Sequence, residues 1–211
     1  MLKSLLVNLC TDRQDEVEDL VIAIKKFSEC ASVKFREIDA IYTVDKDIDA
    51  VILSGSRARI VDEQQRNEFK HVSAFIKRLS LPLLSICYGH QLLCTTFGCE
   101  VEALAEPIID RFEKVHIIKD DPIFSGFKTD QTGSVFFESH NDKVKKNNLN
   151  KAGFILLADS HTCDVEAVRH KNKPFYGVQF HPERTKIESE THPEGHRLIE
   201  NFYKNMVKKK S

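Results

Sequence analysis

The feature that most constrains the fold is an alternation of short apolar segments with amphipathic helical patterns in the first half of the chain. We expect strands at residues 3–9, 33–38, 50–53 and 81–84, and helices at residues 14–27 and 61–78. Such alternation is typical of parallel strands covered on both faces by helices. The sequence therefore predicts an α/β fold with a flavodoxin-like, doubly wound, mostly parallel sheet.

The pattern changes in the second half of the chain. Short apolar runs at residues 114–118, 135–138, 154–158 and 165–169 are separated by turn-rich pieces, which predicts antiparallel strands added beside the parallel sheet. A buried strand is expected at residues 174–180, and residues 194–207 carry an apolar stripe typical of a closing amphipathic helix. Since no linker or repeat divides the 211 residues, we expect one domain spanning residues 1–211.

Composition narrows the class of protein. The 31 basic and 32 acidic side chains nearly cancel, so no global field favours nucleic-acid or membrane binding. The apolar run at the N-terminus is too short for a membrane span and lacks a small-residue cleavage site, so it predicts a core strand. The cysteines show no Cys-x-x-Cys spacing, which indicates free thiols in a cytoplasmic protein; they are Cys10, Cys30, Cys87, Cys94, Cys99 and Cys163.

One cysteine lies where a nucleophile is best activated. The segment Ser85-Ile86-Cys87-Tyr88-Gly89-His90-Gln91 follows an apolar strand and opens a helical pattern, which places Cys87 at a sharp strand-to-helix turn. Such a turn projects the side chain out of the sheet, and the helix behind it directs backbone amides and a positive dipole end at the sulfur. Both effects favour the thiolate over the thiol.

A second segment supplies a base. In Tyr176-Gly177-Val178-Gln179-Phe180-His181-Pro182-Glu183, the strand ends abruptly and leaves His181 and Glu183 two residues apart at the carboxyl edge of the sheet. An imidazole there can accept the thiol proton, while the carboxylate fixes its tautomer and supports the imidazolium. The two segments together predict a Cys-His-Glu catalytic triad.

These two segments resemble the hallmark motifs of the class I glutamine amidotransferases, and the resemblance runs over most of the chain. The resemblance implies that Cys87 is the nucleophile, His181 the base and Glu183 the orienting acid of a glutaminase. Such an enzyme forms a thioester with glutamine and releases ammonia from the side-chain amide.

The oxyanion formed in this reaction needs two preorganised backbone donors. One is expected to be the amide of Tyr88. The resemblance assigns the other to the loop Leu53-Ser54-Gly55-Ser56-Arg57, and thus to the amide of Ser56, although Ser56 and Arg57 replace the usual glycine and proline of the family. Because a side chain restricts the backbone, we expect this loop to rearrange before the oxyanion hole exists, which makes a latent, partner-activated glutaminase a reasonable hypothesis.

Substrate binding is assigned by the resemblance as well. It gives contacts with the bound glutamine to Gly55, Gln91, His140 and Asn141, the last two mainly through the backbone of residues 138–142. The alternative for residues 138–142 is a simple Asx-type turn between strands.

The remaining histidines and cysteines suggest no further chemistry. We expect His90 to pack behind the turn, and the cysteines other than Cys87 to be small buried hydrophobes. His192 and His196 have a spacing that suits a metal, but only two ligands are visible, so we predict no metal and no cofactor.

Within the family, the motifs are most similar to those of the free-standing amidotransferase subunits of GMP synthetases. The sequence has no phosphate-binding loop motif with which to activate an acceptor, so we expect a separate synthetase to receive the ammonia. Two alternatives stay open: a stand-alone γ-glutamyl peptide hydrolase that uses the same triad, and a catalytically quiet regulatory module.

Overall fold

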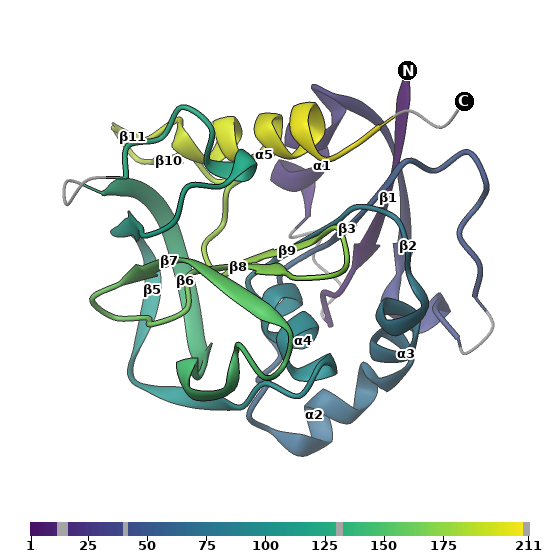
Figure 1. Cartoon of the computed structure of the whole chain (residues 1–211), viewed down its shortest axis with the longest axis horizontal. Helices are drawn as coiled ribbons and strands as arrows, with labels where there is room; N and C mark the ends of the chain where they lie inside the picture. The colour runs from purple at the N-terminus through teal and green to yellow at the C-terminus, as the bar shows by residue number, and fades with distance from the viewer. Residues whose placement is uncertain (12–16, 40–41, 130–132, 209–211) are drawn as a thin grey trace.

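The computed structural model describes residues 1–11, 17–39, 42–129 and 133–208 (Figure 1). Its centre is a nine-stranded sheet with the order β2-β1-β3-β4-β9-β8-β7-β5-β6. The first five strands in this order are parallel: β2 (Ser28–Lys34), β1 (Leu2–Asn8), β3 (Ala50–Leu53), β4 (Leu83–Ile86) and β9 (Phe175–Val178). The other four are antiparallel: β8 (Ala167–His170), β7 (Phe154–Ser160), β5 (Val101–Ile117) and β6 (Ser134–Val144). The predicted α/β fold with added antiparallel strands is confirmed.

Helices cover both faces of this sheet (Figure 1). On one face lie α1 (Glu18–Lys25) and α5 (Glu194–Asn205), whose apolar residues join one core cluster. On the other face lie α3 (Lys70–Arg78) and α4 (Tyr88–Thr96), with α2 (Glu63–Glu68) preceding them, and α3 and α4 contribute to a second cluster. The helix α3 buries one apolar stripe, with Val72, Phe75 and Ile76 packed in the core, whereas α2 buries none of its residues. All nine main strands belong to one sheet, and we propose that residues 1–211 form one domain.

The strand predicted at residues 33–38 is misplaced. The strand β2 ends at Lys34, and residues 35–37 form a short 3-10 helix, η1 (Phe35–Glu37). The cause is that β2 is an edge strand with mostly exposed side chains, so it lacks the apolar alternation of a half-buried strand. Phe35 is buried because its ring stacks on Phe69, with 4.4 Å between ring centroids. Phe35, an apolar residue in the range predicted as a strand, therefore makes a core contact outside any strand.

The predicted helix at residues 61–78 is two helices that meet at Phe69. This residue has φ −96° and ψ 9°, which ends α2 before α3 begins. Its ring is fully buried between Phe35 and Tyr88, so tertiary packing overrides a continuous helix. The predicted helix at residues 14–27 is observed as α1 from Glu18 onward, while residues 14–16 lie outside the described residues.

The antiparallel half is more extensive than predicted. The strands β5 and β6 form a long hairpin-like pair, and residues 138–142 lie within β6, so the alternative of a turn there is wrong. The pairing shifts register on either side of Ile108, and Asp110 has a left-handed φ of 41°. Three short elements were not expected: η2 (Pro122–Phe124), η3 (Lys146–Asn148) and a hairpin of β10 (Lys186–Ile187) and β11 (Glu190–Thr191).

Within the described ranges, none of the helices has the length and apolar character needed to cross a membrane.

Candidate active site

Three parallel strands end at a common cavity. The loop Ser54-Gly55 follows β3, Cys87 follows β4, and Gln179 to His181 follow β9, so their residues meet at the carboxyl edge of the sheet. The cavity has a volume of about 380 Å³, a size typical of small-molecule sites. Its lining includes Gly55, Ser56, Cys87, Tyr88, Gln91, His140, Asn141, His181 and Glu183, so the cavity collects all the residues that the sequence assigned to the site.

Cys87 lies at the expected sharp turn between β4 and α4. Its φ of 50° and ψ of −110° are rare for a residue with a side chain, and its backbone is held by two hydrogen bonds. The amide of Cys87 donates to the carbonyl of Val178 at 2.8 Å, and the amide of Gln91 donates to the carbonyl of Cys87 at 3.1 Å. The neighbouring strand β9 and the first turn of α4 therefore hold Cys87 in this strained backbone conformation.

The turn depends on a close approach of α4 to β3 at Gly89. A Cβ atom at this position would lie 2.9 Å from the Leu53 Cβ atom and 2.9 Å from the Ser54 carbonyl oxygen. Real Cβ contacts of this length do not occur without a shift of the backbone. Gly89 therefore permits the close approach of the α4 backbone to the end of β3.

Replacing Gly89 with alanine is expected to lower the free energy of unfolding by about 3 kcal/mol, because β3 and α4 must move apart. Urea denaturation measures this change. Gly126→Ala is the matched control, since Gly126 has a φ of 78° but a Cβ atom there would meet no other atom within 4 Å, and it should cost only about 1 kcal/mol. Equal losses in the two variants would contradict the steric argument.

His181 and Glu183 form a close pair beside the cysteine. The distance from His181 Nδ1 to Glu183 Oε1 is 2.8 Å, and both side chains are nearly buried. The amide of His181 donates to the carbonyl of Phe137 at 2.8 Å, which fixes the strand end against β6. A Cβ atom on Gly55 would lie 3.0 Å from His181 Cε1 and 3.5 Å from Cys87 Cβ, so the ring and the cysteine share one small space.

The charges in this group support one another. Burial by itself lowers the pKa of His181. The negative charges of Glu183 and Cys87 have a larger effect in the other direction, and they raise this pKa well above 6.5. Burial likewise raises the pKa of Glu183, and the imidazolium of His181 reverses the shift and lowers it below its ordinary value. The arrangement therefore favours a positive ring held between a carboxylate and a sulfur, as a thiolate nucleophile requires.

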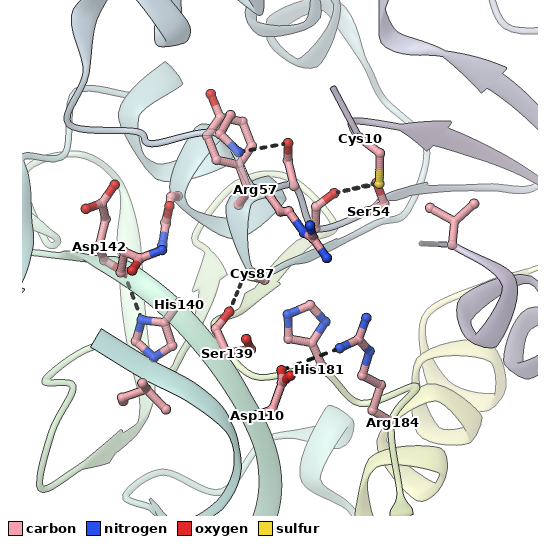
Figure 2. A pocket seen from close by; sticks show the side chains of 18 of the residues that line it. Cys10, Ser54, Arg57, Cys87, Asp110, Ser139, His140, Asp142, His181 and Arg184 are labelled. Carbon is pink, nitrogen blue, oxygen red and sulfur yellow. Dashed lines mark hydrogen bonds and ion pairs between the residues drawn. The ribbon is translucent and has the colours of Figure 1, made fainter. Parts of the chain in front are cut away.

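The loop after β3 is braced by side chains. The Leu9 amide donates to Ser54 Oγ at 2.8 Å, and the Ala58 amide donates to Ser56 Oγ at 3.2 Å. In Figure 2 the side chains of Arg57 and Arg184 reach into the pocket in which His181 lies. The roles of the Ser56 and Tyr88 amides as oxyanion donors stay predictions.

Of the residues assigned to glutamine binding, two have side chains that are already engaged. Gln91 is buried, and its Nε2 donates to the carbonyl of Asp142 at 2.7 Å and to Gln179 Oε1 at 3.0 Å. His140 is buried as well, with Nδ1 2.9 Å from the carbonyl of Asp142 (Figure 2). Binding through the backbone of this segment stays a prediction, as do the assignments of Gly55 and Asn141.

Sequence reasoning missed several residues of the site. Gln179 Nε2 lies 3.8 Å from Cys87 Sγ, and the guanidinium of Arg59 binds the Asp142 carboxylate through Nε at 2.9 Å. Arg184 pairs with Asp110 at 3.9 Å across the pocket (Figure 2). Gln179 was detectable, since it stands inside the second motif. The two arginine pairs join segments more than 70 residues apart and carry no local signal.

His90 and the cysteines other than Cys87 are packed largely as expected. His90 is fully buried behind the turn, and burial lowers its pKa to about 3. All six cysteines lie within the described ranges and none of them forms a disulfide bond, although Cys10 and Cys30 are only half-buried. His192 pairs with Glu190 and His196 with Lys26, so they do not face each other as metal ligands. Among the residues that the structure describes, no group of three or more His, Cys, Asp and Glu side chains is placed to hold a metal.

Comparison with known families agrees with this geometry. The family described as "Glutamine amidotransferase class-I" matches residues 17–206, which is most of the chain. The chain belongs to the class I glutamine amidotransferase family. Cys87, His181 and Glu183 all lie within the matched range.

Individual relatives of this amidotransferase are named as subunits of one enzyme. The chain is 41% identical over 129 residues to a subunit of GMP synthase [glutamine-hydrolyzing] from Methanothermobacter thermautotrophicus, a match that covers 61% of the chain and 63% of the relative. It is 35% identical over 160 residues to the protein of the same name from Methanocaldococcus jannaschii, covering 76% and 75%. The matched part of the first relative is thus somewhat less than two thirds of its length.

Solved structures share the fold of this amidotransferase. A putative GMP synthase subunit from Thermoplasma acidophilum superposes with a TM-score of 0.78 at 26% identity, covering 97% of the chain and 93% of the other. A glutamine amidotransferase from Methylobacillus flagellatus superposes with a TM-score of 0.75 at 14% identity, covering 100% and 98%, which speaks to the fold alone.

Proposed function

We propose that this amidotransferase hydrolyses the side-chain amide of glutamine through a thioester on Cys87 and delivers the ammonia to a separate synthetase subunit. The observation that carries the proposal is the constellation at the sheet edge. There, a strained cysteine begins a helix, and a histidine held 2.8 Å from a buried glutamate shares its cavity.

The proposed reaction proceeds in two halves. The Cys87 thiolate attacks the amide carbon of glutamine, and the backbone amides of Tyr88 and Ser56 stabilise the oxyanion. The imidazolium of His181 gives its proton to the leaving nitrogen, so ammonia departs and a γ-glutamyl thioester remains. His181 then takes a proton from water, the hydroxide attacks the thioester, and glutamate leaves as Cys87 is restored. Glu183 keeps the ring oriented in both halves.

The proposed acceptor is an ATP-using subunit of the GMP synthetase type, which would place the chain in purine biosynthesis. Relatives at 32–41% identity are named GMP synthase or one of its subunits, and the solved structure with a TM-score of 0.78 has a similar name. These relatives favour this function over a stand-alone γ-glutamyl hydrolase or a regulatory module. A docked subunit would also keep the ammonia from being protonated in water.

The test is ammonia release from glutamine by the purified chain, with and without the ATP-using component of a GMP synthetase and its nucleotide substrates. A γ-glutamyl dipeptide is assayed in parallel. Glutamine turnover that increases when the partner is added supports the proposal. Efficient cleavage of the dipeptide without the partner, and no response to it with glutamine, would contradict the proposal in favour of the hydrolase.

Ser56→Gly is expected to raise glutamine hydrolysis without a partner by about tenfold, because the glycine amide can turn toward the oxyanion. Ser56→Ala is the matched control. It removes the same hydroxyl, and with it the bond from the Ala58 amide, but keeps the Cβ atom that restricts the backbone. If alanine raises the rate as much as glycine does, or if neither changes it, the loop does not limit the reaction.

A further inference from the structure

Behind the glutamine pocket lies a buried cluster of acids that the proposed reaction does not use. The side chains of Glu138 and Glu166 have no exposed surface, and His140 beside them is almost as buried. Ser160 Oγ donates to Glu166 Oε1 at 2.7 Å, and the two carboxyl groups are in hydrogen-bond contact with each other. Glu138 Oε2 lies 3.2 Å from His140 Nε2.

If Glu138 and Glu166 were both ionised, their carboxylate oxygens could only accept hydrogen bonds, and neither could donate to the other. Both oxygens of Glu138, Oε2 of Glu166 and Nε2 of His140 have no partner when the carboxyl groups carry no proton. Buried polar atoms without partners are strongly unfavourable. A proton on each carboxyl group removes the conflict: Glu166 then donates to Glu138, and Glu138 donates to His140 Nε2.

The ring of His140 fits this arrangement. Its Nδ1 lies 2.9 Å from the carbonyl oxygen of Asp142, which can only accept, so Nδ1 carries the proton. Nε2 of a neutral ring is then an acceptor that needs a donor. Burial lowers the pKa of His140, which keeps the ring neutral at neutral pH.

The cluster connects to the nucleophile through buried groups. The carbonyl of Asp142 also accepts from Gln91 Nε2 at 2.7 Å. Gln91 Nε2 is 3.0 Å from Gln179 Oε1, and Gln179 Nε2 is 3.8 Å from Cys87 Sγ. The backbone of the same segment touches the cysteine, since the Ser139 carbonyl lies 3.7 Å from its sulfur.

We propose that Glu138 and Glu166 are neutral carboxylic acids that act as positioning residues. Through His140 they hold the segment from Ser139 to Asp142 in the shape that binds glutamine beside Cys87. The proposal rests on the proposed function of that pocket. It assigns a role to two acids outside the triad and explains why a strand that lines the pocket carries a buried glutamate.

The cluster predicts a dependence of substrate binding on pH. Burial raises the pKa of Glu138 to about 8, and it raises that of Glu166 well above 4.5. Because the folded pKa of Glu138 is raised, the stabilisation that its protonated form gives to the cluster is complete below about pH 4.5 and is lost as the pH rises through about 8. The titratable and charged groups around Glu138 come from β5, β6, the segment before β8 and the end of β9; they are Arg111, Glu113, His140, Cys163, Glu166 and His181.

The test compares two substitutions of similar size. Glu138→Gln keeps a donor for His140 at every pH, whereas Glu138→Met removes it. KM and kcat for glutamine are measured between about pH 6.5 and 9.5. We expect the KM of the unmodified chain to rise above about pH 8, the KM of Glu138→Gln to stay flat, and the KM of Glu138→Met to be about tenfold higher throughout.

Two kinetic results would overturn the proposal. One is an alkaline rise in KM that is the same in Glu138→Gln as in the unmodified chain. The other is a Met variant whose KM equals that of the Gln variant. If Glu138→Met does not fold, the pH profile of Glu138→Gln decides the question alone.

A measurement without turnover separates this proposal from the proposed function. The ¹⁵N chemical shifts of the His140 ring report its tautomer in the free protein. A neutral ring with the proton on Nδ1 at pH about 7 supports the neutral acid pair. An imidazolium would contradict it, because His140 would then donate to an ionised Glu138. Absence of glutamine turnover in the unmodified chain would reject the proposed function and leave this result standing.

Discussion

Replacement of Cys87 by alanine is expected to reduce glutamine hydrolysis by at least about 10⁴-fold while the protein stays folded. Alanine keeps the Cβ atom and the backbone angles of the turn, so the bonds to Val178 and Gln91 persist. What is lost is the sulfur that forms the thioester. Ammonia release and the circular dichroism spectrum of the same preparation measure the two parts of this prediction.

The matched control is Cys10→Ala. Cys10 lines the same pocket, with its sulfur 3.8 Å from the Gly55 carbonyl, but it lies two residues after the end of β1 and not at the turn before α4. It should retain nearly full activity. Loss of turnover in Cys10→Ala together with turnover in Cys87→Ala would reverse the assignment of the nucleophile.

Glu183→Gln is expected to lower the rate of glutamine hydrolysis by about 10²- to 10⁴-fold, because an amide neither fixes the tautomer of His181 nor stabilises the imidazolium. The pKa of His181 should fall as well. In the folded chain that pKa lies well above 6.5, so the charged ring stabilises the protein fully below pH 6.5, and this is lost as the pH rises through the folded pKa. Without Glu183, the loss should occur at a lower pH, which NMR titration of His181 measures.

Glu190→Gln provides the control for this substitution. Glu190 also pairs with a histidine two residues later, at 2.8 Å from His192 Nε2, but this pair is exposed on the β10–β11 hairpin. It should leave the rate and the His181 titration unchanged. An unaltered titration of His181 in Glu183→Gln would show that the carboxylate does not control the charge of the ring.

The parallel half of the fold, and the placement of Cys87, His181 and Glu183 at the edge of its sheet, could be predicted from the sequence because their signals are local. Strands such as β3 and β4 are buried on both faces, so they read as continuous apolar runs, and the motifs at Cys87 and His181 stand directly after strands. The edge strand β2 has no such run, and the break at Phe69 is caused by rings from Phe35 and Tyr88, which are distant in the sequence.

Much of the site beyond Cys87, His181 and Glu183 could not be predicted from the sequence, for a related reason. The pair between Arg59 and Asp142 and the acid pair of Glu138 and Glu166 depend on how β6 lies against other elements. Glu138 stands at the end of the strand predicted at residues 135–138, and only the packing of β6 in the fold shows that its side chain is buried. Signals of this kind appear only when the topology is known.

The most direct test of the proposed reaction is to quench the chain with acid during turnover of glutamine and analyse its peptides by mass spectrometry. We expect a γ-glutamyl adduct on the peptide that contains Cys87, and no adduct on any peptide of Cys87→Ala. Steady release of ammonia with the γ-glutamyl group on a different residue, or with Cys87→Ala as active as the unmodified chain, would contradict the proposal.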